Sequence, residues 1–179
     1  MVSGAIHSKL RVAKGSTRPD RLLGLEIRPK RTGFVVLERN TQLVDWGTRM
    51  FRAATIRDEA LRRKLSGLLE FYAPTAIVVR HRSGLAAAPA ARVRDIIHEI
   101  KLEARRRSIT FRHITANQVH QFFEQHGCRT KYETARLLAQ RFEGLTSKLP
   151  PKRKPWQSEH PSMVVFDALA AAVTQCGTE

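Results

Sequence analysis

The sequence predicts an α/β domain in which a mixed five-stranded sheet is flanked by helices. Near the start, three apolar segments at 22–27, 33–38 and 43–51 follow one another with only short turns between them. Further along, apolar segments at 75–80 and 109–114 alternate with segments of helical periodicity. Short turns join antiparallel strands, whereas a connection through a helix joins parallel ones. We therefore expect three antiparallel strands followed by two parallel strands.

The helices are predicted from the spacing of apolar residues and from the residues that begin or end a helix. Apolar residues recur at the helical period in 58–72, and Pro89 is suited to begin a helix over 89–107. Thr115 can cap a short helix that reaches residue 123 before Gly127. Two more helices are predicted at 132–142 and 161–175, the second with Pro161 in its first turn.

Residues 21–179 are expected to form one domain, because a chain of this length can bury one proper core. Residues 1–19 carry four basic side chains and no acid, so we predict a flexible basic arm over 1–20; a transit peptide is the alternative. The segment 144–160 is basic and rich in proline and is predicted to be a loop, either functional or disordered. Trp156 is expected to anchor this loop, with stacking on a base as the alternative.

The composition favours a polyanionic partner. The 32 Lys and Arg residues against 16 Asp and Glu give a formal charge of +16, which indicates a nucleic acid, DNA in preference to RNA. No apolar run approaches the ~18 residues that cross a bilayer, so no membrane partner is expected. Cys128 and Cys176 have no partner at metal-ligand spacing and are expected to be reduced thiols. We expect a cytoplasmic, nucleoid-associated protein, with organellar targeting as the alternative.

Three chemically informative residues are expected to converge. Glu26 lies on the first strand, Arg80 ends the fourth strand, and Asp167 lies on the last helix. They meet only if the first and fourth strands are neighbours, which right-handed crossovers favour. Acids on a first strand and a last helix suggest a metal-dependent nuclease site, in which Arg80 stands where a carboxylate is needed.

The order of four motifs resembles the ribonuclease H-like superfamily and, within it, the RuvC family of Holliday-junction resolvases. The resemblance covers residues 21–176. Its motifs are Gly24, Glu26, Thr32, Gly33 and Phe34 at the start, Arg80 six residues after Pro74, Gln118-Val119-His120 leading to Lys131, and Asp167-Ala168-Leu169-Ala170 at the end.

The resemblance implies a site of four carboxylates that hold two magnesium ions for phosphodiester cleavage. Glu26 and Asp167 match the first and fourth acids, whereas Arg80 and Val164 stand at the second and third. If the chain is active, Mg²⁺ or Mn²⁺ is the expected cofactor, held by Glu26 and Asp167. His160, next to Glu159, is a further candidate metal ligand; the alternative is a capping or surface histidine.

The presence of arginine at position 80 suggests that a fixed positive charge replaces a metal ion. A guanidinium cannot bind a cation, but it pairs with carboxylates in a forked geometry. We therefore expect Arg80 to contact Glu26 or Asp167 and to take the place of the metal's charge. Pairing of Glu26 with a nearby base is also what a purely structural carboxylate would show.

The expected contacts to nucleic acid are basic residues around this site. Lys131 matches a family lysine that helps at the scissile phosphate, so it is the first candidate and also a candidate catalytic residue. The other candidates are Arg28, Lys30, Arg31, His120, Lys152, Arg153 and Lys154.

Three functions remain open at this point. The first is a RuvC-like protein that binds branched or structured DNA and has a weak or inactive nuclease site. The second is an active, magnesium-dependent, structure-selective endonuclease with a rearranged site. The third is a structural protein of a ribonucleoprotein. The resemblance also implies a homodimer, for which the helix over 89–107 is the candidate interface.

Overall fold

The computed structural model describes residues 20–29, 31–39, 41–50, 59–81, 91–154 and 156–178, without the side chain of His81. The predicted basic arm, apart from Asp20, lies outside the described residues, as do Lys30 and Pro89. Within the described part, no helix combines the length and the hydropathy needed to cross a membrane.

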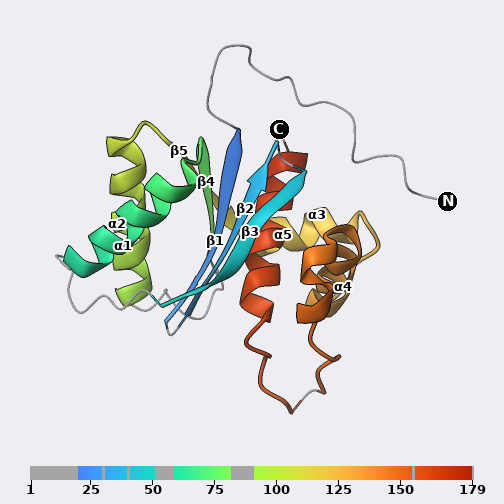
Figure 1. Cartoon of the computed structure of the whole chain (residues 1–179). Helices are drawn as coiled ribbons and strands as arrows, with labels where there is room; N and C mark the ends of the chain where they lie inside the picture. Colours follow the sequence, from blue (N-terminus) through green and yellow to red (C-terminus); the bar gives the residue numbers. More distant parts are fainter. Residues whose placement is uncertain are drawn as a thin grey trace.

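The described chain has the predicted order of elements (Figure 1). The strands are β1 (Arg21–Arg28), β2 (Arg31–Glu38), β3 (Gln42–Arg49), β4 (Ala76–His81) and β5 (Thr110–Thr115). The helices are α1 (Glu59–Tyr72), α2 (Ala91–Arg106), α3 (Ala116–Glu124), α4 (Lys131–Arg141), the 3₁₀ helix η1 (Glu143–Lys148) and α5 (Met163–Gly177).

The sheet has the strand order β3-β2-β1-β4-β5, so β1 and β4 are neighbours. β1 pairs with β2 and β2 with β3 in antiparallel fashion, whereas β4 is parallel to both β1 and β5. The predicted mixed sheet of three antiparallel strands and two parallel ones is therefore confirmed.

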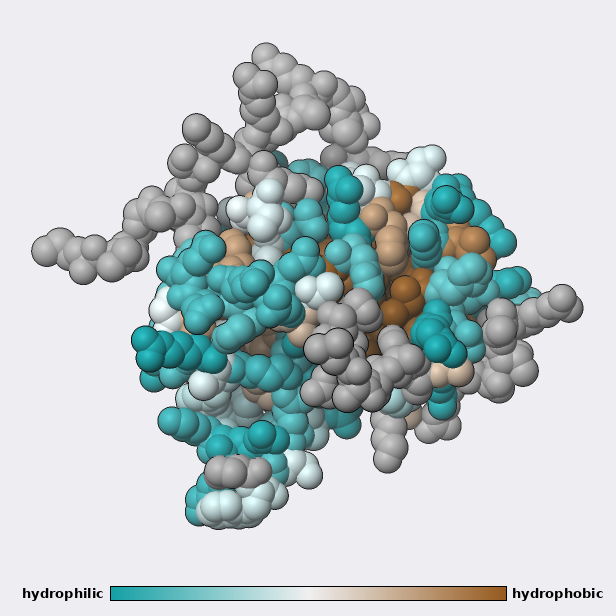
Figure 2. Space-filling model, turned by 180° about the vertical axis from the view of Figure 1, so that it is seen from behind, coloured by the Kyte–Doolittle hydropathy of each residue, from teal (hydrophilic) through white to brown (hydrophobic). Residues whose placement is uncertain are grey.

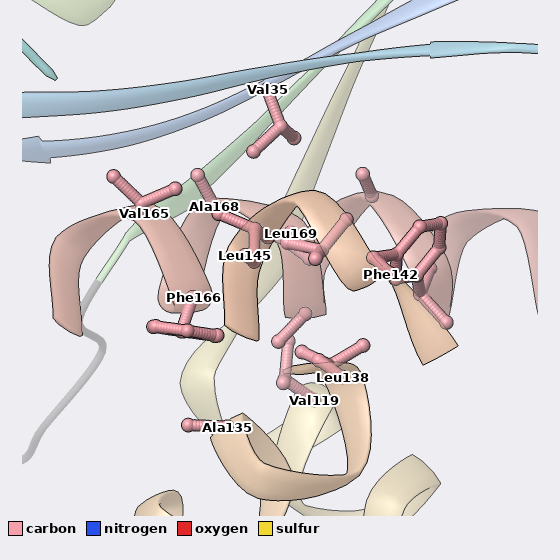
Figure 3. Packing of buried hydrophobic residues seen from close by; sticks show 14 of the residues in the cluster. Val35, Val119, Ala135, Leu138, Phe142, Leu145, Val165, Phe166, Ala168 and Leu169 are labelled. Atoms are coloured by element: carbon pink, nitrogen blue, oxygen red, sulfur yellow. The ribbon is translucent and has the colours of Figure 1, made fainter. Parts of the chain in front are cut away.

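Each face of the sheet is covered by helices, which gives two separate cores. Figure 1 shows α1 and α2 on one side of the sheet and α3, α4 and α5 on the other. Alternate residues of β1 divide between the faces: Leu23 and Leu25 pack under α1 and α2, whereas Leu22 packs toward α5. Figure 3 shows the second core, where Val35 points from the sheet toward α5.

Two glycines let α5 lie directly on the sheet. A Cβ at Gly33 would lie 2.2 Å from the backbone oxygen of Val164, and a Cβ at Gly24 would lie 2.8 Å from the backbone oxygen of Ala168. Both distances are far inside van der Waals contact, so any side chain here would push the helix away. The Gly24 and Gly33 motif therefore sets the height of Asp167 above the strands.

The structure corrects three boundaries. The segment 144–160 is not irregular throughout, because η1 continues the chain to Lys148 after α4 ends. The last helix begins at Met163 and not at Pro161, since a turn in which Met163 N donates to the His160 oxygen precedes it. The third strand ends at Arg49. The predicted cap at Thr115 is confirmed: its hydroxyl accepts from the backbone N–H of Gln118.

Candidate functional site

Strand pairing places the first functional side chains side by side. Glu26 and Arg80 are direct partners in the parallel register of β1 and β4. Neighbours in register point to the same face of a sheet, and residues two apart on one strand do so as well. Glu26, Arg28 and Arg80 therefore share the face that α5 covers, at the end where both strands finish.

Arg80 bridges the two buried carboxylates. Its Nη1 lies 2.7 Å from Asp167 Oδ1 and 3.5 Å from Glu26 Oε2. The three residues expose 5%, 6% and 1% of their surface respectively. These contacts are ion pairs without hydrogen-bond geometry, because neither Nη1 nor Nε of Arg80 makes a hydrogen bond among the described residues. The predicted convergence of positions 26, 80 and 167 and the predicted contact of Arg80 are confirmed.

Arg28 forms a second bridge above the first. Its Nη2 donates to Asp167 Oδ2, and its Nε lies 3.4 Å from Glu26 Oε1. Its Nη1 donates to Glu159 Oε2 over 2.6 Å. Arg28 thus links β1 and α5, through Glu26 and Asp167, to Glu159 on the segment that precedes α5.

Lys131 completes the arrangement from the first residue of α4. Its Nζ donates to Asp167 Oδ2 over 2.9 Å and to Glu159 Oε1 over 2.6 Å. Three cations thus alternate with three carboxylates. We call this set the charge cluster; it consists of Glu26, Arg28, Arg80, Lys131, Glu159 and Asp167.

Comparison with solved structures identifies the architecture. T. thermophilus RuvC in complex with a Holliday junction substrate superimposes with a TM-score of 0.66 and 18% identity, over 89% of this chain and 94% of that one. The yeast mitochondrial Holliday junction resolvase Ydc2 gives 0.61 and 14%, over 89% and 78%. The fowlpox virus resolvase in complex with Holliday junction DNA gives 0.54 and 10%, over 88% and 99%.

The chain has the RuvC-like ribonuclease H fold. The similarity lies in structure alone: no family model matches the sequence, and no curated protein matches it at the significance required. The fold that the four short motifs predict is therefore confirmed by superposition on solved structures, although each of these proteins is less than 20% identical in sequence to this chain.

The contacts within the charge cluster and its burial shift the pKa of several of its members. Burial raises the pKa of Glu26 to about 7, although Arg80 and Arg28 oppose the shift. Burial works against the charge of Arg28 too, but Asp167, Glu159 and Glu26 together raise the pKa of Arg28 above its ordinary value. Glu159 is partly buried, yet Lys131 and Arg28 hold its pKa below its ordinary value. Glu159 is thus ionised at neutral pH, whereas Glu26, with a pKa of about 7, carries a proton for part of the time.

We expect the free energy of unfolding to fall as the pH rises from about 5 to about 7 because of Glu26. Its pKa is about 7 in the folded chain against an ordinary value of 4.5. Between these values the folded chain holds a proton that the unfolded chain has lost. The stability contributed by this proton is full below pH 4.5 and is lost as the pH rises through 7.

Urea unfolding of the chain and of Glu26→Gln across this pH range measures the effect. One proton corresponds to a slope of at most about 1.4 kcal/mol per pH unit. The variant keeps the shape of the side chain but cannot titrate, so its slope should be smaller by up to this amount. Equal slopes in the two proteins would contradict a shifted Glu26.

The donor set present does not suit the two magnesium ions that the RuvC-like fold implies. Both oxygens of Asp167 and both oxygens of Glu26 already face guanidinium or ammonium groups within 3.5 Å. A divalent cation added here would meet fixed positive charge where it needs free oxygen ligands. Within the described ranges, no group of three His, Cys, Asp or Glu side chains has a geometry that could hold a metal ion.

The other predicted residues lie at various distances from this centre. Val164 is buried against Gly33 at the base of α5. His120 is exposed and lines a small pocket of about 50 Å³ together with Arg80, Lys131 and Asp167. His160 is not brought into a ligand group with Glu26 and Asp167; its Nδ1 lies 2.8 Å from the Ser162 hydroxyl.

The predicted basic residues remain at the surface. Arg31 is half-buried on β2, and Lys30 lies outside the described residues. Lys152, Arg153 and Lys154 are exposed on the segment that projects below α4 and α5 in Figure 1. Figure 2 shows the reverse face, on which hydrophilic residues predominate around smaller brown, apolar areas. Trp156 is 78% exposed, so the expectation that it anchors the loop is wrong; the Lys154 ammonium lies 5.5 Å from its ring centre.

The sequence did not predict the contacts that Arg28 and Glu159 make within the charge cluster. Arg28 was expected to contact nucleic acid from just after the predicted strand over 22–27, but it lies on β1, two residues after Glu26. The i,i+2 spacing on a strand was a usable signal, since it puts both side chains on one face. Glu159 was considered only beside His160, and its contacts to Arg28 and Lys131 depend on how the segment folds back.

Proposed function

We propose that this chain is a RuvC-like protein that binds branched or structured DNA and cuts it weakly or not at all. The observation that carries the proposal is the pair of guanidinium groups, Arg80 and Arg28, that neutralise Glu26 and Asp167. Two buried carboxylates repel each other unless a positive charge lies between them. A permanently charged arginine supplies that charge without a metal ion.

The proposed DNA-binding surface is the rim of the charge cluster. Lys131 keeps 45% of its side chain exposed while it holds Asp167 and Glu159. Next to it lie His120 and the exposed basic residues of the segment between η1 and α5. Clustered cations with no equal number of acids attract phosphates and release counterions, which is the main source of affinity for DNA.

A four-way junction and a linear duplex of the same composition test the proposal. We expect tighter binding to the junction and at most weak cleavage of either DNA with Mg²⁺ or Mn²⁺. The same assay with an RNA duplex separates DNA from RNA binding. Failure to bind any of these nucleic acids would contradict the proposal.

The alternative of an active endonuclease is favoured by the resolvases that share the fold. In that case Mg²⁺ or Mn²⁺ would be required, and Asp167→Asn would abolish cutting. Metal-dependent junction cleavage that this variant loses would therefore replace our proposal by the alternative. Cleavage that survives in Asp167→Asn would point to a contaminating nuclease.

We further propose that the chain forms a homodimer through α2 and that it is associated with the nucleoid. The exposed positions of α2 include Arg94, Lys101 and Arg105, so the contact would be polar and sensitive to salt. Sedimentation equilibrium at low and high salt tests the dimer: a monomer under both conditions would contradict it.

Glu159→Gln should raise the affinity for DNA. The Glu159 carboxylate occupies Arg28 and Lys131, the two cations nearest to Asp167 that are also partly exposed. A DNA phosphate must compete with this carboxylate, and the neutral amide competes less well. We expect an increase of about 1.5- to fivefold at low salt, the range of a surface charge pair.

Fluorescence anisotropy with a labelled junction measures this change. Glu143→Gln is the matched control, since Glu143 lies at the start of η1 and is not part of the charge cluster. Both variants remove one negative charge, so an equal gain in the two would assign the effect to net charge and not to Glu159.

A further inference from the structure

A pocket opens beside the charge cluster. It has no role in the proposed neutralisation of Glu26 and Asp167 by arginine. Its volume is about 470 Å³, within the range of small-molecule sites in proteins. It lies between the first residues of α4 and the segment that runs from η1 to α5. Lys131 and Glu159 belong both to this pocket and to the charge cluster.

The lining of the pocket combines flat apolar walls with positive charge. Tyr132, Pro150 and Pro151 provide the apolar surface, and Lys152 and Arg153 provide charge at its exposed side. Among the described residues, the only carboxylate in the lining is Glu159, which Arg28 and Lys131 already hold. The uncompensated charge of the pocket is therefore positive.

This combination suits one nucleotide. A base has a flat face that stacks on an aromatic ring and packs on proline, whereas its flanking phosphates need cations. Neither an apolar ligand nor a free anion would use both halves of the lining. A base inside a duplex is already stacked and paired, so the nucleotide that enters this pocket at least cost is an unpaired one.

We propose that this pocket binds a single unpaired nucleotide of a DNA strand, with the base against Tyr132 and the prolines and the phosphates on Lys131, Lys152 and Arg153. The proposal rests on the proposed DNA binding and adds a reason for preferring structured DNA. Because Lys131 belongs to both the charge cluster and the pocket, a DNA strand bound on the charge cluster has its next nucleotide at the mouth of the pocket.

Duplexes that contain 2-aminopurine, either paired or as a single-nucleotide bulge, test this proposal. We expect the bulged duplex to bind about tenfold more tightly, the size of one base stacked on an aromatic ring. Its fluorescence should be quenched on binding more than that of the paired duplex. Tyr132→Ala should abolish the preference, and Tyr132→Phe should keep it.

Phe71→Ala is the control, because Phe71 is 76% exposed on α1, on the other side of the sheet. It should bind like the unaltered chain. The comparison of two duplexes on the unaltered chain decides the proposal even if a variant does not fold.

Two negative results have different meanings. Salt-dependent binding of both duplexes with equal affinity and equal fluorescence would overturn the nucleotide pocket and leave the proposed function standing. No binding to either duplex would overturn both.

Discussion

Arg80→Met should destabilise the folded chain by about 3–5 kcal/mol, the usual result of removing one partner from a buried ion pair. Methionine fills similar space but leaves Glu26 and Asp167 facing each other in a site that exposes 1% and 6% of them. Urea unfolding, followed by circular dichroism, measures the loss. Arg80→Lys keeps the charge and should be destabilised less.

The matched control is Arg112→Met. Arg112 is an exposed residue of β5, and its substitution should stay within about 0.5 kcal/mol. Loss of less than about 1 kcal/mol in Arg80→Met would mean that the two carboxylates do not need Arg80. If Arg80 replaces a metal, Arg80→Asp should in turn be stabilised by Mn²⁺, by about 2.7 kcal/mol at a hundred times the dissociation constant.

The affinity for DNA should fall about a thousandfold between about 50 mM and about 200 mM salt. The cations near the charge cluster offer enough phosphate contacts for a slope of about −5 in a plot of log affinity against log salt concentration. They are Arg31, Lys131, Lys152, Arg153 and Lys154 at the rim, with Arg28 behind them. A slope this steep means that binding is dominated by phosphate contacts.

Single variants locate these contacts. Arg153→Ala should make the slope shallower by about one unit, as expected for one phosphate contact. Lys64→Ala removes an equal charge from an exposed position of α1, on the opposite side of the sheet, and should leave the slope unchanged. A flat salt dependence, or equal effects of both variants, would contradict the assigned surface.

Much of the fold could be predicted because its strands follow simple patterns. Leu23 and Leu25 alternate with Gly24 and Glu26, which is the signature of a strand between two different layers. Gly24 and Gly33 were recognised as motif residues, but the reason for them is a contact between α5 and the sheet that no single segment reveals. The sheet order then brought Glu26 and Arg80 together as expected.

The outer half of the site depended on tertiary structure. Glu159 lies 28 residues from Lys131 and 131 from Arg28, on a segment without regular structure. Neither periodicity nor spacing predicts where such a residue will point. The same holds for Trp156, whose size suggested an anchor although its ring lies 78% exposed.

Calorimetric titration of the chain with Mn²⁺ tests most directly whether fixed arginine charge has replaced bound ions. We predict no saturable binding at the charge cluster, and the same heats for Asp167→Asn as for the unaltered chain. Two ions bound per chain, with both lost in Asp167→Asn, would contradict this account.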